Sequence, residues 1–177
     1  MGLLFLDLDH FKQVNDTHGH GTGDALLRTV AERLRAAMRS RGDGARARDC
    51  VGRIGGDEFV ALVTDVPDQE AVMDLANRLL RKLRKPMLVD GQELLASASI
   101  GVAVYPDDGT DYDVMLRKAD AAMYQAKAAG RGAARLHIEG IPQAVSSERG
   151  IPDAAPAGGS GGSSMGNGNL LQHDAVS

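Results

Sequence analysis

The sequence is short of the features that would tie it to an oxidising compartment, a bilayer or a nucleic-acid duplex. Its single cysteine, Cys50, has no partner for an internal disulfide, which favours a reducing cytoplasm. No apolar run approaches the roughly 20 residues that span a bilayer, so we expect no membrane segment. The net charge of −4 argues against nucleic acid as a partner. The apolar start, MGLLFLDLDH, lacks a basic n-region and predicts a strand instead of a signal peptide.

Composition divides the chain into a core and a tail. The 177 residues are 43% hydrophobic and 25% charged, which is typical of a globular domain. From Gly140 onward the chain is rich in Gly, Ser, Ala and Pro, so it has little apolar surface to offset the entropy of ordering. We therefore predict one domain over residues 1–139 and a disordered tail over residues 140–177.

Apolar periodicity and turn residues predict the elements of the first half. A strand over residues 2–8 precedes a short helix over residues 11–17. The GHGTGD loop is expected to end at Thr22 or Gly23, and a helix with one apolar face then runs to about Ser40. DCVGRI and FVALVTDV are predicted strands, joined as a hairpin through Gly55–Glu58.

The second half alternates helices and strands in the same way. Asp68 is expected to cap a helix whose apolar stripe is Val72, Leu75, Leu79 and Leu83. PMLVDGQELLASASIGVAVYP predicts a hairpin that turns at Asp90-Gly91, and a helix over residues 111–129 ends at Gly130. ARLHI is the last strand. This order predicts an α+β fold of the ferredoxin-like or polymerase-palm kind, with a central, mostly antiparallel sheet flanked by helices.

Two pairs of carboxylates stand at strand ends. Asp7 and Asp9 are two residues apart on a strand and therefore point to one face. Asp57 and Glu58 are adjacent at a glycine-rich hairpin tip, where like charges repel. A strand end bending into solvent would account for the first pair alone. Carboxylates gathered from two strand ends are, however, what Mg²⁺ requires, and together they suggest metal-assisted phosphoryl or nucleotidyl transfer.

Five segments resemble one family in both order and spacing: FLDLDHFKQVND, GHGTGD, RIGGDEF, SIGVAVYP and ADAAMYQAKAAGRG. They are similar to the GGDEF domain of diguanylate cyclases over residues 3 to about 138. The resemblance implies a nucleotidyl-cyclase palm that acts as a symmetric homodimer. Such a dimer condenses two GTP molecules into the signalling nucleotide cyclic di-GMP and releases pyrophosphate, each 3′-hydroxyl attacking the α-phosphate of the partner nucleotide.

The same resemblance implies the metal and catalytic residues. The carboxylates of Asp7 and Asp57 and the carbonyl of Leu8 are the expected ligands of Mg²⁺ (or Mn²⁺). Asp57 and Glu58 are the expected catalytic acids, and Asp57 would also help to take the proton. A metal there would acidify the 3′-hydroxyl and neutralise charge on the α-phosphate. Gly55 and Gly56 are expected next to GTP, because a side chain at either position would obstruct a phosphate.

Further GTP contacts are implied at Lys12, Asn15, His20, Asp24, Lys127 and Arg131. Asn15 and Asp24 resemble guanine readers, since a carboxylate accepts from the N1–H and the exocyclic amine of guanine. Asp24 could instead serve as a cap or first-turn acid of a helix, and His20 as a structural histidine. His18 is expected on the surface. The phosphate-binding pair, Lys127 and Arg131, is expected to share a helix face, where composition alone predicts a solvated basic helix end.

Arg46 and Asp49, in RARD, have the R-x-x-D arrangement that precedes the signature in the family. There it forms an inhibitory site that binds a dimer of the product, cyclic di-GMP. An arginine fork suits phosphate or guanine edges. The surrounding loop is rich in arginine, so a chance match is the alternative.

The sequence departs from the family pattern at two places. Family domains usually carry a helix and a D-x-L-T-x-L-x-N-R motif before the first strand, whereas this chain begins at the strand. We therefore expect either a fragment of a longer protein or a truncated product with little activity. Gly132 stands where an asparagine commonly follows the arginine, and we expect little consequence.

Three functions compete at this point. The first is a Mg²⁺-dependent diguanylate cyclase with product inhibition. The second is a non-catalytic module that binds GTP or cyclic di-GMP, and the third is another palm-type nucleotidyl transferase, which the guanine readers disfavour. Degenerate family members usually lose signature acids or phosphate contacts. This sequence retains Asp7, Asp57, Glu58, Lys127 and Arg131, so the enzyme is favoured.

Overall fold

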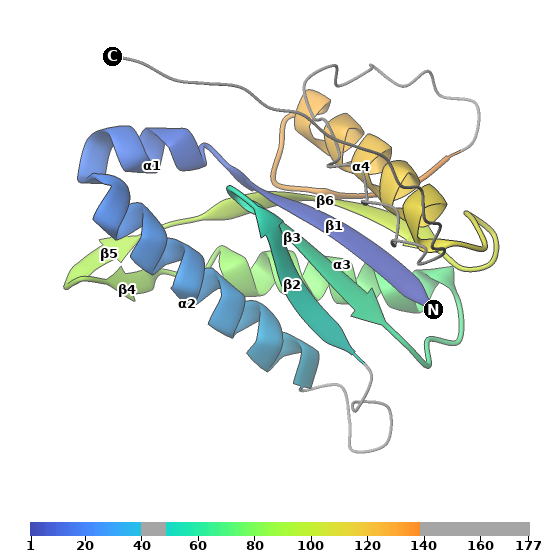
Figure 1. Cartoon of the computed structure of the whole chain (residues 1–177). Coiled ribbons are helices and arrows are strands. Elements are labelled where there is room, and N and C mark those ends of the chain that lie inside the picture. The colour runs from blue at the N-terminus through green and yellow to red at the C-terminus, as the bar shows by residue number, and fades with distance from the viewer. Residues whose placement is uncertain (40–48, 139–177) are drawn as a thin grey trace, which may run out of the picture. The chain divides into compact units, whose positions relative to one another are not determined.

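The computed structural model describes residues 1–39 and 49–138, and these form a mixed sheet with helices on both faces (Figure 1). Five strands pair in the order β2-β3-β1-β6-β7, and β4-β5 form a separate pair. The strands are β1 (Gly2–Asp9), β2 (Cys50–Gly55), β3 (Glu58–Val63), β4 (Met87–Val89), β5 (Gln92–Leu94), β6 (Ser97–Val104) and β7 (Ala134–Leu136). All pairings are antiparallel except that of β6 with β7. The predicted α+β palm-like architecture is confirmed.

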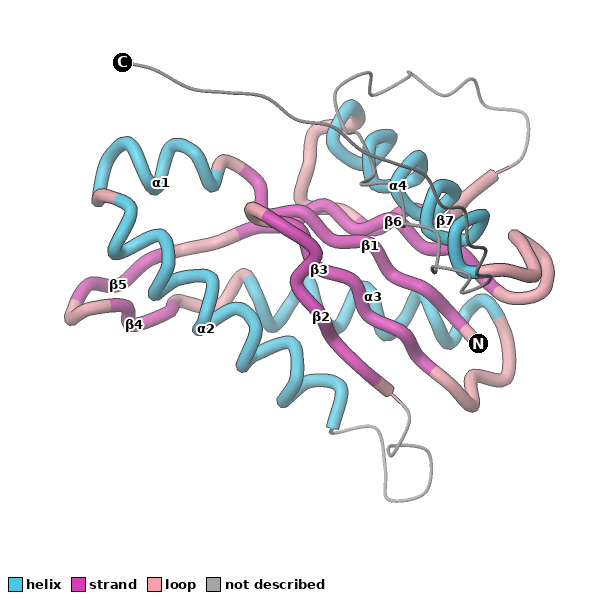
Figure 2. Tube along the Cα trace, in the orientation of Figure 1, coloured by secondary structure: helices cyan, strands magenta, loops and turns pink. Residues whose placement is uncertain are grey.

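The helices divide the core between the two faces of the sheet. They are α1 (Phe11–His18), α2 (His20–Arg39), α3 (Gln69–Leu83) and α4 (Tyr112–Ala128). Alternate residues of β1 point to opposite faces. Leu4, Leu6 and Leu8 therefore pack with α2 and α3, whereas Leu3 and Phe5 pack with α4 on the other face. Figure 2 shows how these helices are arranged around the sheet. The alternation along β1 places Asp7 and Asp9 on the α4 side.

Local signals confirm where two helices begin. The N–H of Ala71 donates to Asp68 Oδ1 at 2.8 Å, so Asp68 caps α3 as predicted. Asp111 accepts from the N–H of Val114 at 2.9 Å and caps α4 in the same way. The predicted stripe of α3 is fully buried. No helix within the described ranges is long and apolar enough to cross a membrane.

The structure differs from the sequence predictions in several places, including the predicted strand FVALVTDV, which ends at Val63. Helix α2 begins at His20 and not at Thr22 or Gly23. The single residue Gly19, with φ 84°, is enough to end α1 and to change the direction of the chain before α2. The segment after α3 is not one hairpin. Asp90 and Gly91 do turn β4 into β5, with φ of 48° and 80°, but β6 then continues into the main sheet beside β1. The predicted tail, Ser40 and Arg46 lie outside the described residues.

Helix α4 lies unusually close to the sheet where it crosses β6. A Cβ atom built on Gly101 would be 1.8 Å from the carbonyl oxygen of Ala119 and 2.3 Å from the amide nitrogen of Met123. Only glycine therefore permits this approach. Because the last turn of α4 carries Lys127, the glycine also sets how far that lysine lies from the strand ends.

Candidate active site

The two acidic pairs meet at one end of the sheet. Asp7 of β1 is the direct antiparallel partner of Glu58 of β3, so their side chains lie on the same face. Asp57 occupies the turn between β2 and β3, and its carbonyl accepts the N–H of Leu8 at 3.2 Å. The prediction that the first strand and the Gly55–Glu58 hairpin are neighbours in one sheet is confirmed.

Asp7 forms an ion pair with a lysine side chain of the same domain. Its carboxylate is 5% exposed, and Lys127 Nζ lies 2.7 Å from Oδ1. Within residues 1–39 and 49–138, no group of three or more His, Cys, Asp or Glu side chains is placed to hold a metal. A metal at Asp7 and Asp57 would therefore also need oxygen from the main chain, from substrate or from water, as Mg²⁺ commonly does. The acidic, oxygen-only donor set fits such an ion.

The glycines of the hairpin leave space beside the backbone. Gly56 has φ 49°, and Arg53 Nε donates to its carbonyl at 2.8 Å, which holds the turn. A Cβ atom built on Gly55 or Gly56 would meet nothing within 4 Å. The exposed backbone at the turn can therefore be approached closely, as the sequence interpretation requires.

The structure places Asn15 beside the backbone that precedes Asp24. A Cβ atom on Gly23 would be 1.9 Å from Asn15 Oδ1, so the amide of Asn15 lies against the backbone just before Asp24. Asp24 is exposed in the second turn of α2, and the first turn contains no acid. The alternative that Asp24 caps the helix is therefore wrong, because the helix begins four residues earlier.

A cleft of about 600 Å³ extends from Asp24 between α2 and β2. Its lining includes Phe59 and three cationic side chains that sequence reasoning missed: Arg28, Arg35 and Arg53. The spacing of Arg28 and Arg35, two turns apart on one helix, was the available signal. The cleft offers an apolar wall and three positive charges beside two exposed carboxylates, Asp24 and Glu32.

Arg131 does not share a helix face with Lys127, contrary to the prediction. Helix α4 ends at Ala128, and Gly130, Arg131 and Gly132 follow with φ of 113°, 64° and 62°. The N–H of Arg131 donates to the carbonyl of Ala126 at 3.0 Å, which folds this turn back over the helix end. Arg131 therefore projects from a left-handed turn and is exposed.

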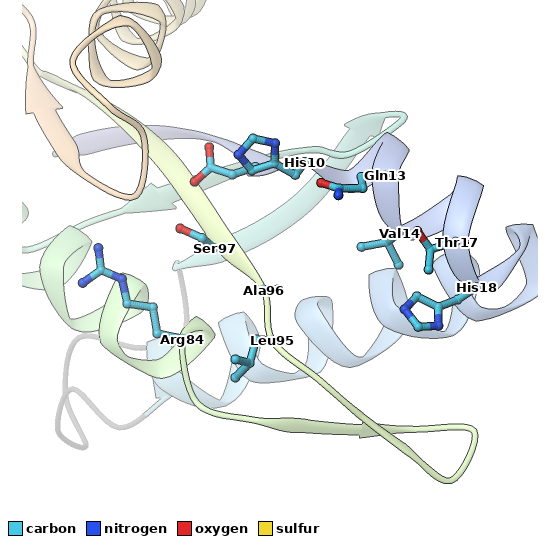
Figure 3. Close-up of a pocket in the computed structure, with 10 residues that line it drawn as sticks. His10, Gln13, Val14, Thr17, His18, Arg84, Leu95, Ala96 and Ser97 are labelled. Atoms are coloured by element: carbon cyan, nitrogen blue, oxygen red, sulfur yellow. The ribbon is translucent and has the colours of Figure 1, made fainter.

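The other predicted substrate residues lie on exposed helical positions. Lys12 is on α1, and His20 is the first residue of α2. His18 is on the surface, as expected, and lines a second cleft of about 530 Å³. Figure 3 shows Thr17 and His18 at one end of this cleft.

One further carboxylate on α4 is electrostatically perturbed. Burial raises the pKa of Asp120 above its ordinary value of 3.8, and the positive charge of Lys127 opposes this rise. Lys127 thus interacts with an acid on its own helix as well as with Asp7.

Comparison with known proteins assigns the family. Residues 1–133 match the diguanylate cyclase GGDEF domain. The chain belongs to the GGDEF family. It is 46% identical over 129 residues to the bifunctional diguanylate cyclase/cyclic di-GMP phosphodiesterase MucR of Pseudomonas aeruginosa, covering 73% of this chain and 18% of MucR. It is 42% identical over 136 residues to the cyclic di-GMP phosphodiesterase NbdA of the same organism, covering 77% of this chain and 16% of NbdA.

Solved GGDEF structures have the same fold. The GGDEF domain of TpbB from Pseudomonas aeruginosa superposes with a TM-score of 0.71 at 35% identity, covering 77% of this chain and 76% of that one. The GGDEF domain of DgcB from Caulobacter crescentus, in complex with c-di-GMP, gives 0.65 at 28% identity, covering 77% of each chain. This GGDEF domain spans only 16% of NbdA and 34% of full-length TpbB.

The predicted inhibitory pair is only partly described in this GGDEF domain. Asp49 lies just before β2, and its Oδ1 accepts from the N–H of Thr64 at 2.8 Å and from Thr64 Oγ1 at 3.3 Å. These bonds tie the outer end of β2 to the end of β3. Arg46 lies outside the described residues, so the inhibitory site stays a prediction.

Asp9 is the residue of the acidic strand end that sequence reasoning left without a role. Its Oδ1 accepts from Ser99 Oγ at 2.8 Å, and its Oδ2 accepts from the N–H of Gly132 at 3.0 Å. The only signal in the sequence was its spacing from Asp7, which predicted the correct face but not these partners.

Proposed function

We propose that this GGDEF domain is a diguanylate cyclase, which condenses two GTP molecules into cyclic di-GMP and pyrophosphate. One observation carries the proposal. Asp7 and Glu58 face each other across β1 and β3, Asp57 sits at the adjoining turn, and Lys127 contacts Asp7. Acids and a cation from three separate elements thus meet beside a glycine turn that leaves room for phosphate.

The carboxylates of Asp7 and Asp57 and the carbonyl of Leu8 would hold Mg²⁺ (or Mn²⁺). When bound, the metal supplies charge neutralisation at the α-phosphate and a more acidic 3′-hydroxyl. Lys12, Lys127 and Arg131 supply positive charge for the triphosphate, and Gly55 and Gly56 expose the backbone to it. Asn15 and Asp24 read guanine, with the cleft between α2 and β2 open beside them.

The reaction proposed is two sequential nucleotidyl transfers. Each 3′-oxygen forms a bond to the α-phosphorus of the other nucleotide while the bond to the β-phosphate breaks and pyrophosphate leaves. Asp57 helps to take the proton of the attacking hydroxyl, and Glu58 completes the acidic pair. One domain presents one GTP, so a homodimer is needed to bring two together.

The alternative is a non-catalytic module that binds GTP or cyclic di-GMP. Relatives named as phosphodiesterases favour it: NbdA of Pseudomonas aeruginosa matches this chain at 42% identity, and PdeR of Escherichia coli matches it at 39%. The intact signature acids and phosphate cations favour the cyclase.

Incubation with GTP and Mg²⁺, followed by chromatography of the products, distinguishes the two functions. We expect cyclic di-GMP from the wild type and none from Asp57→Asn, with unchanged circular dichroism. Asp74→Asn is the matched control, because it makes the same charge change at an exposed position of α3. Normal synthesis by Asp57→Asn would assign the chemistry elsewhere. A wild type that binds GTP or cyclic di-GMP by calorimetry, yet makes no product at high protein concentration, would establish the binding module.

A further inference from the structure

The turn after α4 is held in a costly conformation. Gly130, Arg131 and Gly132 have positive φ in succession. Glycine adopts this backbone freely, but a residue with a side chain is disfavoured there, because its Cβ atom approaches the following carbonyl oxygen. Arg131 is such a residue. Strain of this kind persists only where the surroundings fix it, and it commonly marks a functional position.

Side chains from two different elements form hydrogen bonds to the backbone N–H and carbonyl of Gly132. The carboxylate of Asp9 accepts the N–H of Gly132, and the guanidinium of Arg84, at the end of α3, donates to the carbonyl of Gly132. A Cβ atom at Gly132 would be 3.0 Å from Arg84 Nη2 and 3.1 Å from Ser97 Oγ. Figure 3 shows Arg84 and Ser97 at the end of the cleft opposite His18. The left-handed backbone also explains why glycine can replace the family's asparagine here, since both tolerate it.

Asp9 is itself fixed in place. It is 9% exposed, and its other oxygen accepts from Ser99 Oγ, whose side chain is fully buried on β6, the strand beside β1. The contacts of Asp9 therefore join β1, β6 and the turn after α4. We name Asp9, Ser99, Arg84 and Gly132 the turn latch.

We propose that the turn latch positions Arg131 for phosphate binding, and that Asp9 is a positioning residue and not a metal ligand. This inference rests on the proposed function, in which Lys127 and Arg131 bind the triphosphate. The two carboxylates of β1 then have separate tasks. Asp7 contacts Lys127 directly, at 2.7 Å, whereas Asp9 holds the residue that follows Arg131.

Substitution of Asp9 by asparagine distinguishes the two possible roles of Asp9, as part of the turn latch or as a metal ligand. In Asp9→Asn the amide oxygen can accept from the N–H of Gly132, and the amide nitrogen can donate to Ser99 Oγ. A latch therefore survives this substitution, whereas a metal ligand loses its charge. Asp9→Ala and Arg84→Met each remove one of the two hydrogen bonds that the turn latch makes to Gly132. Arg84 is exposed at a helix end, so Arg84→Met tests the latch even if Asp9→Ala fails to fold.

The experiment measures binding by calorimetry with two probes, a non-hydrolysable GTP analogue with Mg²⁺ and guanosine. We expect Arg84→Met and Asp9→Ala to weaken binding of the analogue about 10- to 100-fold. This is the range seen when the hydrogen-bonded partner that orients a metal ligand is removed. Guanosine affinity should not change, and Asp9→Asn should bind the analogue within a few-fold of wild type. If Arg84→Met weakens both probes alike, the latch acts on the whole fold and not on the phosphate contact, and the inference is overturned.

Two other outcomes overturn the inference. If Arg84→Met binds the GTP analogue with unchanged affinity, the turn latch does not position a phosphate contact. Loss of analogue binding in Asp9→Asn that a higher Mg²⁺ concentration restores shows that Asp9 acts through its charge, as a ligand would. Arg131→Met tests the proposed function separately. If that variant binds the analogue like wild type, Arg131 does not contact phosphate and the proposed function fails at this residue, whatever the latch variants do.

Discussion

Substitution of Gly101 by alanine tests the close approach of α4 to the sheet. The added Cβ atom would be 1.8 Å from the carbonyl oxygen of Ala119 and 2.3 Å from the amide nitrogen of Met123. Both obstacles are backbone atoms, so no side-chain rotation relieves the clash. Ordinary contact begins near 3.4 Å, so the helix must move away by roughly 1.5 Å.

The cost can be estimated from packing. Inserting a methyl group into a packed interior usually costs about 1–3 kcal/mol. At about 2–4 °C per kcal/mol, the melting temperature should fall by roughly 2–12 °C. Synthesis of cyclic di-GMP should fall further than stability alone explains, because α4 carries Lys127 and a 1 Å displacement of a site residue can cost about 10²-fold.

Gly52→Ala is the matched control for Gly101→Ala. It makes the same change in a strand of the same sheet, but its Cβ atom would meet nothing within 4 Å and its φ is not positive. We expect unchanged stability or a gain of up to about 1 kcal/mol. Thermal unfolding by circular dichroism measures both variants. Equal melting temperatures for Gly101→Ala and wild type would refute the argument from close approach.

Three other substitutions test separate parts of the site. Gly23→Ala should push Asn15 away, since the new Cβ would be 1.9 Å from its Oδ1, and should reduce the preference for GTP over ATP in a binding competition. Asp120→Asn should be more stable than wild type at pH 7. The raised pKa means that the native state holds its proton more tightly, so wild-type stability falls as pH rises from 3.8 through that pKa; a denaturation series in which the difference does not shrink toward acid pH would contradict this. Arg46→Ala should weaken product inhibition about tenfold or more, as loss of charged hydrogen bonds of about 1.5–3 kcal/mol implies. Progress curves with added cyclic di-GMP that match the wild type would leave RARD an ordinary basic loop.

Features that depend on neighbouring residues could be predicted from the sequence. Asp68 caps α3 through a bond to an amide three residues along the chain, and Asp90-Gly91 turns β4 into β5 by their own backbone angles. The spacing of Asp7 and Asp9 placed both on one face because strand side chains alternate. Each of these depends on a few consecutive residues, so a linear pattern carries the information.

Only the tertiary structure decided what those residues contact. Asp7 and Asp9 are the same residue type on the same face of one strand, yet Asp7 contacts Lys127 whereas Asp9 accepts from Ser99 and Gly132. Their partners come from β6, α4 and the turn beyond it, about 90 to 120 residues later in the chain. Gly130 ends α4 before Arg131, as the sequence predicts, but contacts of Asp9 and Arg84 with Gly132 accompany a left-handed backbone at Arg131 that local preference disfavours. Such contacts exist only once the sheet has placed distant segments side by side, and no local pattern records them.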